Sequence, residues 1–291
     1  METLDALILG ALQGVTEFVP ISSSGHLVIA EEFLGLDVSS LKSFDVIVHV
    51  GTLLAILLYF WDDVWGLISA FWRLVSGRLE KDDPYGRMIL YIVIGTVPAV
   101  FAGVYLGEWI DGIFRNVSAV GWAMMGVGFV FLLAEFVYKF KPAEGFFTKV
   151  RDFFRRDNAE KEVREMRWWK AILIGLAQAT ALIPGVSRSG MTISAGLFSG
   201  VERTNAARFS FLLGVPAILG AGIYTGIGEM GNGAAEGAIC LNPLPLIVGF
   251  LASFVVGFLS ISLLMKFLKK HSLVLFAIYL IGMGLIIQNF L

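Results

Sequence analysis

The sequence has little cysteine, little charge and no marked excess of either charge sign. With one cysteine, Cys240, the chain cannot form an intrachain disulfide framework, and this residue is expected to pack as a small apolar side chain. The 22 basic and 24 acidic residues give a net charge of -2, which is too balanced to indicate nucleic-acid binding. No basic segment precedes the first apolar run, so the N-terminus does not resemble a cleaved signal peptide and insertion should depend on internal spans.

Apolar residues dominate what is present. The chain is 57% hydrophobic and 16% charged, with a mean hydropathy of +0.78, which indicates a polytopic membrane protein. A membrane-spanning helix needs about 20 predominantly apolar residues. The segment 61–87 mixes tryptophans with basic residues and predicts an interfacial amphipathic helix and loop. Six spans are predicted, at about 44–60, 88–106, 119–137, 206–227, 246–265 and 273–287.

Two further apolar segments, at about 4–36 and 171–201, are each divided into two short helices by a turn of serine and glycine. A half-length helix cannot cross a bilayer, so each segment is predicted to enter the membrane and return as a re-entrant hairpin. The non-helical backbone of such a turn is tolerated only where protein or a wet cavity covers it.

The two hairpins resemble one another at an offset of about 165 residues. This offset pairs Gln13 with Gln178, and it pairs Ser22-x-Ser24-Gly25 with Ser187-x-Ser189-Gly190. The match predicts an all-α membrane domain built by internal duplication. The first repeat occupies 1–137, a charged linker occupies 138–170, and the second repeat occupies 171–291.

Each repeat would hold one re-entrant hairpin and three spans, and an odd number of spans requires the repeats to insert with opposite topology. The basic residues support this arrangement independently. If 61–87, 138–170, 201–208 and 266–271 share one face, that face carries every lysine and arginine except Lys42, Arg115 and Arg188. By the positive-inside rule it is cytoplasmic. Both termini then lie outside, and the tips of the two hairpins meet near the midplane.

The meeting point is expected to bind an anion. Helix starts present free backbone N–H groups and the positive end of the helix dipole. Arg188 adds a guanidinium whose fork suits phosphate, and an arginine at membrane depth is a functional hypothesis by default. The residues expected to bind phosphate are Ser22, Ser24, Gly25, Ser187, Arg188, Ser189 and Gly190.

Three other polar residues accompany these turns. Gln13 and Glu17 are four residues apart and share a helix face, so Glu17 is suited to bind a divalent cation with Gln13 as a neutral oxygen ligand, or to act as a base. His26 is suited to protonate a leaving oxygen, to activate a serine, or to attack phosphorus itself. Asp45 and His49 are left out of the chemistry and placed at the outer mouth of a cavity.

Structural interpretations of the same residues compete with these. Serine and glycine turns in membrane helices often serve packing, Glu17 and Arg188 would also serve as a buried ion pair that locks the hairpins together, and His26 would also serve as a hydrogen-bonding group. A purely structural pair, however, leaves the duplicated serine turns without a purpose.

The motifs also resemble those of a known family. QGVTEFVPISSSGH and PGVSRSGMT are similar to the two signatures of the BacA-type undecaprenyl-diphosphate phosphatases, and the similarity extends over nearly the whole chain, including the ending LFAIYLIG. The resemblance implies an integral membrane enzyme that removes the terminal phosphate of undecaprenyl diphosphate and so recycles the lipid carrier for cell-wall synthesis. Its partners would be this lipid substrate and the surrounding membrane lipids.

The resemblance also implies roles for individual residues, which are assigned by their positions in the two motifs. Gln13 and Glu17 correspond to the acidic motif, Ser23 and His26 to the proposed nucleophile and its partner, and Arg188 to the phosphate-binding arginine. Because Gln13 takes the glutamine option of the first motif position, a site for a divalent cation, Mg²⁺ or Ca²⁺, would carry one negative charge fewer. The expected location is the cell membrane, with the site open to its outer side.

Two other functional classes compete with a hydrolase. Inverted repeats with broken helices are typical of transporters, so the same site would also suit a carrier of an anion or a flippase of a lipid phosphate. A membrane scaffold would account for the hydrophobicity but not for Glu17 and Arg188 at membrane depth. The sequence does not choose between Ser23 and His26 as the attacking group, and it leaves open the oligomeric state, for which a homodimer is one option.

Overall fold

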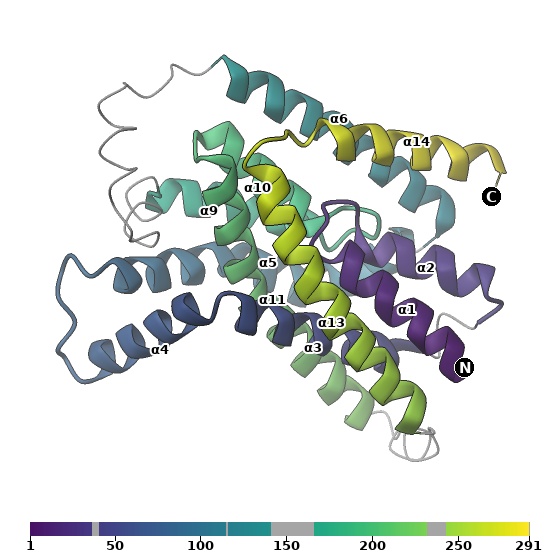
Figure 1. Ribbon diagram of the computed structural model, residues 1–291, viewed down its shortest axis with the longest axis horizontal. Coiled ribbons are helices and arrows are strands. Elements are labelled where there is room, and N and C mark those ends of the chain that lie inside the picture. The colour runs from purple at the N-terminus through teal and green to yellow at the C-terminus, as the bar shows by residue number, and fades with distance from the viewer. Residues whose placement is uncertain (37–40, 115, 141–165, 232–242, 291) are drawn as a thin grey trace.

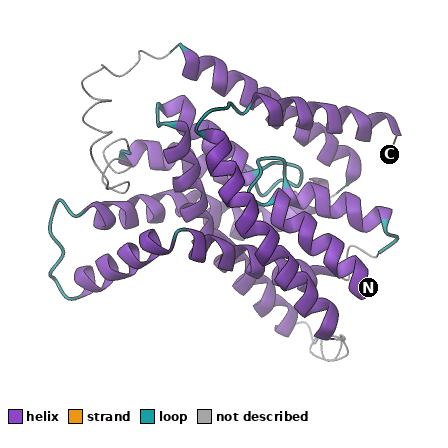
Figure 2. Ribbon diagram, viewed as in Figure 1, coloured by secondary structure: helices purple, strands orange, loops and turns teal. Residues whose placement is uncertain are grey.

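The computed structural model describes residues 1–36, 41–114, 116–140, 166–231 and 243–290, and the regular structure in these ranges is helical throughout (Figure 2). Cys240 and Arg115 lie outside the described residues, as does most of the predicted charged linker. The helices are α1 (Thr3–Thr16), α2 (Ser23–Phe33), α3 (Lys42–Tyr59), α4 (Trp61–Val75), α5 (Pro84–Phe114), α6 (Val117–Lys139), α9 (Trp168–Thr180), α10 (Arg188–Ser199), α11 (Arg203–Gly231), α13 (Pro243–Leu268) and α14 (Val274–Phe290).

Four of these helices are long and apolar enough to cross a membrane: Pro84–Gly107 within α5, all of α6, Arg203–Ile223 within α11, and all of α13. They coincide with four of the six predicted spans. Helices α3 and α4 meet the same test only as a pair, which is bent by 85°, and α14 is a shorter apolar helix of 17 residues. The chain is therefore an all-helical, multi-pass membrane protein, as its composition predicted.

Each predicted hairpin consists of two short helices joined by an irregular turn, α1 with α2 and α9 with α10. The second helix begins in both cases at a serine whose hydroxyl accepts a backbone N–H: Ser22 caps α2 and Ser187 caps α10. Helix α10 ends at Gly200, whose φ of 85° lies in the left-handed region that glycine adopts without strain. Serine therefore caps the starts of α2 and α10, and glycine ends α10.

The hairpins pack against spans from the other half of the chain. Helix α1 lies along α13 and helix α9 along α5, while α6 lies beside α14 (Figure 1). Glycine permits both hairpin contacts, because a Cβ atom on Gly10 would lie 2.9 Å from the Cα of Gly249 and one on Gly175 would lie 2.8 Å from the Cα of Gly95. The two halves are thus interlocked rather than placed side by side.

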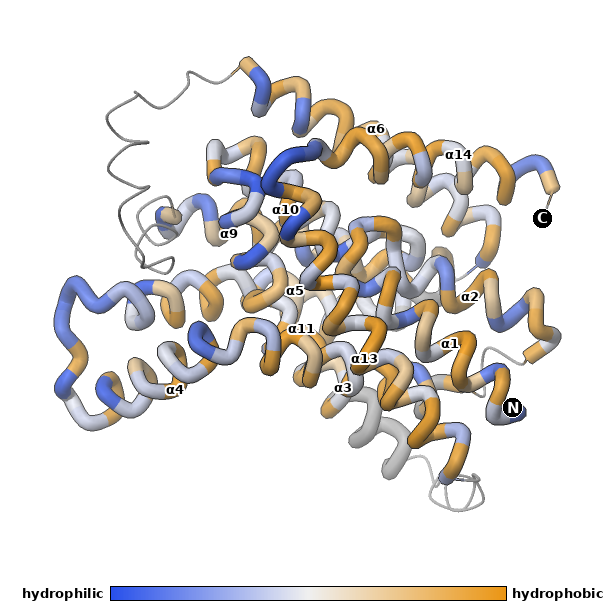
Figure 3. The backbone as a smooth tube through the Cα atoms, in the orientation of Figure 1, coloured by the Kyte–Doolittle hydropathy of each residue, from blue (hydrophilic) through white to orange (hydrophobic). Residues whose placement is uncertain are grey.

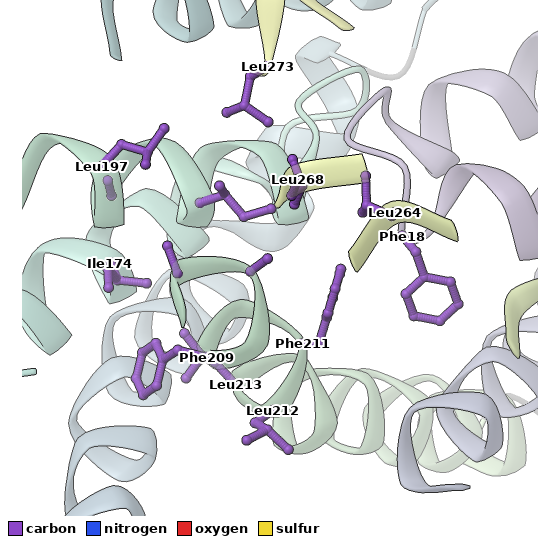
Figure 4. Packing of buried hydrophobic residues seen from close by; sticks show 14 of the residues in the cluster. Phe18, Ile174, Leu197, Phe209, Phe211, Leu212, Leu213, Leu264, Leu268 and Leu273 are labelled. Carbon is purple, nitrogen blue, oxygen red and sulfur yellow. The ribbon is translucent and has the colours of Figure 1, made fainter. Parts of the chain in front are cut away.

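Buried apolar side chains from several helices fill the centre (Figure 4). Phe18, in the turn after α1, meets Phe211 of α11 edge to face, with 5.6 Å between ring centroids. Outward-facing positions are also apolar: Phe101 on α5 is 61% exposed and Leu263 on α13 is 67% exposed. Figure 3 shows that hydrophobic residues predominate along the helices, while hydrophilic residues gather at the connection between α4 and α5. Lipid is the solvent that such a surface requires.

Two ion pairs fasten α11 to its neighbours. Arg208 donates through Nε to Asp63 of α4 at 2.9 Å, with a second, shorter contact through Nη2, and both side chains are largely buried. Arg203 donates to Glu135 of α6 through Nε at 3.1 Å and through Nη2 at 2.7 Å. Because breaking one side of a buried pair leaves an uncompensated charge, these contacts fix α4 and α6 against α11.

We expect Asp63→Asn to destabilise the protein by about 3 kcal/mol or more, since it leaves the Arg208 guanidinium buried without its carboxylate. The matched control is Asp82→Asn, because Asp82 pairs with Arg87 on the surface with an 89% exposed side chain. That control should cost less than about 1 kcal/mol. Thermal unfolding in detergent measures both changes, and equal unfolding temperatures for the two variants would contradict the assignment.

Candidate active site

Glu17 stands at the centre of a hydrogen-bonded cluster that joins the two hairpins. It follows the last turn of α1 and is 6% exposed. Its Oε2 atom accepts from Gln13 Nε2 at 2.9 Å and from Ser23 Oγ at 2.7 Å, and its Oε1 atom accepts a short contact from Arg188 Nη2. Four residues that the sequence singled out therefore meet, three from the first hairpin and Arg188 from the second.

Arg188 is the first residue of α10, and its guanidinium uses only part of its donor capacity on Glu17. The Nη1 atom is buried and has no hydrogen-bond partner among the described residues. Gly214 of α11 makes the room for this guanidinium, because a Cβ atom there would fall against Nη1 and lie 2.8 Å from Cζ. A buried donor without a partner is costly, and Nη1 is free to donate to an acceptor such as a phosphate oxygen.

The expected phosphate-binding serines have structural partners in their own turns. Ser22 Oγ accepts from the Gly25 N–H at 3.3 Å, and Ser187 Oγ accepts from the Gly190 N–H at 3.2 Å. Ser187 Oγ also lies 3.3 Å from Ser189 Oγ. Ser22 therefore keeps its O–H to donate to an anion, and so does one of the two hydroxyls of Ser187 and Ser189, since only one of them donates to the other.

The two glycines of the motifs accommodate side chains of α6. A Cβ atom on Gly25 would lie 2.8 Å from Met124 Cε, and one on Gly190 would lie 2.7 Å from Phe131 Cε1. Both α6 side chains are fully buried. One helix therefore covers the starts of both α2 and α10, and this close cover explains why the serine turns end in glycine.

Ser22 has the only positive φ of a non-glycine residue in the part of the chain that the structure describes, 75°. Such a backbone costs about 1–3 kcal/mol and persists only where its surroundings hold it. Ser23 follows directly and donates to Glu17. The strained residue thus sets the direction in which the Ser23 hydroxyl is presented.

His26 makes no hydrogen bond with the Ser23 hydroxyl among the contacts of its two ring nitrogens. Its Nδ1 atom is 2.7 Å from the carbonyl oxygen of Ser22, and its Nε2 atom is 2.7 Å from the Tyr279 hydroxyl of α14. Both ring nitrogens are therefore engaged by groups other than Ser23 and Glu17. Ser24, the remaining predicted residue, is partly exposed on the first turn of α2.

Two residues near the site were not predicted to take part in it. His49 of α3 places Nε2 at 3.7 Å from Glu17 Oε2, while its Nδ1 atom is 2.7 Å from the carbonyl oxygen of Asp45. Tyr279 holds His26. His49 could have been identified from the sequence, because a histidine within an apolar span indicates a functional position. Tyr279 could not, because a tyrosine in an apolar helix is not unusual.

Gln178, the counterpart of Gln13, has a different environment. It is 3% exposed, and neither atom of its amide group has a hydrogen-bond partner among the described residues. Four residues later the second hairpin has Leu182 where the first has Glu17. The two similar hairpins therefore share the serine-capped turn but differ in their charged groups, with the carboxylate in one hairpin and the guanidinium in the other.

This arrangement is suited to phosphoryl transfer. It holds a hydroxyl on a buried carboxylate, a guanidinium with an unused donor, and two helix starts that are positively polarised. Little else is required, since catalysis of phosphoryl transfer depends on positioning and on stabilising charge.

Comparison with known proteins gives full-length matches. A model of the family described as bacitracin resistance protein BacA matches residues 6–286. An undecaprenyl-diphosphatase of Rubrobacter xylanophilus is 39% identical over 292 residues, covering 100% of this chain and 99% of that protein. An undecaprenyl-diphosphatase of Chloroherpeton thalassium is 40% identical over 288 residues, covering 98% and 95%. One of Methanosphaera stadtmanae is 37% identical over 298 residues, covering 98% and 97%.

We expect Gly214→Ala to displace the Arg188 guanidinium from Glu17 and to destabilise the protein by about 1–3 kcal/mol, the usual cost of overpacking. Gly220→Ala, on the same helix with nothing within 4 Å of the added carbon, is the matched control and should be neutral or slightly stabilising. Thermal unfolding in one detergent compares them. If both variants unfold at the temperature of the natural protein, Gly214 does not set the position of Arg188.

Proposed function

The chain belongs to the BacA family of bacitracin resistance proteins, and from this membership and the site geometry we infer that it is a membrane undecaprenyl-diphosphatase. It hydrolyses the terminal phosphate of undecaprenyl diphosphate and returns the monophosphate carrier to cell-wall synthesis. The observation that carries this inference is the bond from the Ser23 hydroxyl to Glu17, which is itself held by Arg188 of the other hairpin. A carrier or flippase does not require a hydroxyl that is hydrogen-bonded to a carboxylate.

Ser23 is the group best placed to attack. Its Oγ atom forms a bond to the terminal phosphorus while its proton passes to Glu17 Oε2, at 2.7 Å. The bond from that phosphorus to the bridging oxygen breaks, and undecaprenyl monophosphate leaves with the electron pair. Water then hydrolyses the phosphoserine, with Glu17 returning the proton to Ser23. His26 is less suited to attack because both of its ring nitrogens are engaged elsewhere.

Arg188 stabilises the phosphoryl group during this transfer. Its unpartnered Nη1 donor is available to a phosphate oxygen, and its Nη2 donor already fixes Glu17. Charge on the transferring group is spread over three oxygens, so a planar fork of donors is more effective than a point charge. The capped starts of α2 and α10 add oriented N–H groups and hydroxyls.

A divalent cation, Mg²⁺ or Ca²⁺, fits the same site. No three His, Cys, Asp or Glu side chains cluster as ligands within the described ranges, so the diphosphate and water would complete the coordination. Gln13 Oε1 is buried and has no hydrogen-bond partner among the described residues, and with Glu17 it offers the oxygen ligands that hard cations prefer. When bound, the cation would neutralise charge on the diphosphate.

The proposed architecture is an inverted duplication with six spans and two re-entrant hairpins. The exchange of partners supports it: α1 packs on α13 and α9 on α5, and the close crossings occur at Gly10 and Gly175, which the offset of about 165 residues pairs. Figure 1 places the start of α1 and the end of α14 on the side opposite to the α4–α5 connection. The proposed location is the cell membrane, with both termini and the mouth of the site outside.

Purified protein in detergent should release inorganic phosphate from a C55 polyprenyl diphosphate. Glu17→Gln should lower kcat by about 10²–10⁴-fold, because the base for Ser23 is lost, and Ser23→Ala should lower it at least as much. Release should fall on chelation of divalent cations and return when Mg²⁺ is restored.

Substrate labelled in its terminal phosphate tests the attacking group. A labelled adduct on the natural protein that survives acid and is absent from Ser23→Ala identifies the serine ester, whereas an acid-labile adduct lost in His26→Ala would assign the attack to His26. A folded natural protein that releases no phosphate with any divalent cation would refute the proposed activity.

The orientation has its own test. In a Cys240→Ala background, cysteine tags added at the two termini should react with a membrane-impermeant thiol reagent in intact cells. A cysteine introduced by Arg78→Cys, in the connection between α4 and α5, should react only after the membrane is permeabilised, because the basic face is cytoplasmic. The reverse pattern would overturn the proposed orientation while leaving the chemistry of the site intact.

A further inference from the structure

A tyrosine of the last helix is bound to the histidine of the first hairpin. Tyr279 of α14 places its hydroxyl 2.7 Å from His26 Nε2, and the two rings are nearly parallel, with 5.7 Å between their centroids. His26 is 8% exposed and Tyr279 is 40% exposed. The contact therefore spans 253 residues of sequence and ties α14 to the helix that begins at Ser23.

The partners of His26 fix which nitrogen carries its proton. A carbonyl oxygen can only accept, so the Nδ1 atom must donate to Ser22 O. In the neutral ring, Nε2 then has only a lone pair and accepts from the Tyr279 O–H. The hydroxyl of Tyr279 thus stabilises one tautomer and one orientation of the imidazole ring.

In this orientation, the His26 ring is hydrogen-bonded to a residue with a strained backbone, Ser22. The Ser22 carbonyl receives two donors from His26, the ring Nδ1–H at 2.7 Å and the backbone N–H at 3.2 Å. Ser22 is also the residue with the positive φ of 75°. A strained backbone persists only where its surroundings over-determine it. The two bonds from His26, together with the Gly25 N–H that Ser22 Oγ accepts, are local interactions that keep Ser22 in this conformation.

We propose that Tyr279 and His26 are positioning residues that hold the strained backbone at Ser22, so that Ser23 presents its hydroxyl to Glu17. This proposal rests on the proposed function, since it assigns the attack to Ser23. The first hairpin then has two fixed points on either side of Ser23: the carboxylate of Glu17 on its hydroxyl and the imidazole on the preceding carbonyl. The hydroxyl of Tyr279 acts only through His26.

Tyr279→Phe removes the hydroxyl and keeps the ring. We expect it to lower kcat for phosphate release by about ten-fold, the scale of one buried hydrogen bond, with KM changed less than about two-fold. Tyr59→Phe is the matched control, because Tyr59 of α3 is partly buried against the rings of Phe60 and Phe258, outside the site. Unfolding temperatures are measured for both, to compare folded proteins.

A second substitution separates positioning from direct chemistry. Glycine adopts a positive φ without strain and is tolerated at a helix N-cap. In Ser22→Gly, the hydrogen bonds from His26 are therefore no longer needed to hold the backbone in this conformation. In that background, Tyr279→Phe should lower kcat by no more than about three-fold, which is a coupling that a double-mutant cycle measures. If Tyr279→Phe behaves as the Tyr59→Phe control, or if its ten-fold loss persists in the Ser22→Gly background, the proposal is wrong.

A spectroscopic measurement keeps this proposal distinct from the proposed function. The chain has three histidines, so ¹⁵N-histidine labelling gives few signals, and His26→Gln assigns those of His26. The natural protein should show Nδ1 protonated and Nε2 hydrogen-bonded, and Tyr279→Phe should shift the Nε2 signal. An unshifted signal would refute the contact even in an active enzyme, whereas a shifted signal in a protein that releases no phosphate would refute the activity and not the contact.

Discussion

The ion pair between Glu17 and Arg188 is the interaction on which the site depends. It joins the two hairpins through residues that are 171 positions apart in sequence, inside a protein whose surroundings disfavour any uncompensated charge. The pair was expected either as a lock between the hairpins or as part of a reactive site. Both alternatives are compatible with the contacts: Glu17 also accepts a hydrogen bond from the Ser23 hydroxyl, and the buried Nη1 donor of Arg188 has no partner among the described residues. In the proposed mechanism, the atoms that join the two hairpins also take part in the chemistry.

Small residues make this arrangement compatible with a membrane interior. Gly214 gives Arg188 its place beside Glu17, and Gly25 and Gly190 admit α6 over the two helix starts. One backbone donor at each of those starts is capped, the Gly25 N–H by Ser22 and the Gly190 N–H by Ser187. Irregular backbone at membrane depth is thereby covered by protein and satisfied by hydroxyls, which is the condition under which it is tolerated. The two similar turns are therefore covered by protein, and in the proposed mechanism they also bind the substrate phosphate.

The different charged groups of the two similar hairpins follow from the cost of an uncompensated charge. Two carboxylates or two guanidiniums facing each other would repel, whereas one of each satisfies both charges. The second hairpin accordingly has Leu182 where the first has Glu17, and the first has Ser23 where the second has Arg188. An apparently symmetric pair of turns can therefore produce one asymmetric centre, with the hydroxyl and carboxylate on one side and the guanidinium on the other.

The sequence by itself determined the membrane class, the helical architecture, the positions of four long spans, and the four residues Gln13, Glu17, Ser23 and Arg188 that meet in the site. Hydrophobic length, helix caps and costly polar groups in apolar segments are local signals, which is why they could be interpreted without coordinates. The partners of His26 and the approach of His49 to Glu17 were decided only by tertiary structure. They depend on how α14 and α3 pack against the first hairpin, and a partner 253 residues away leaves no periodicity or spacing from which it could be predicted.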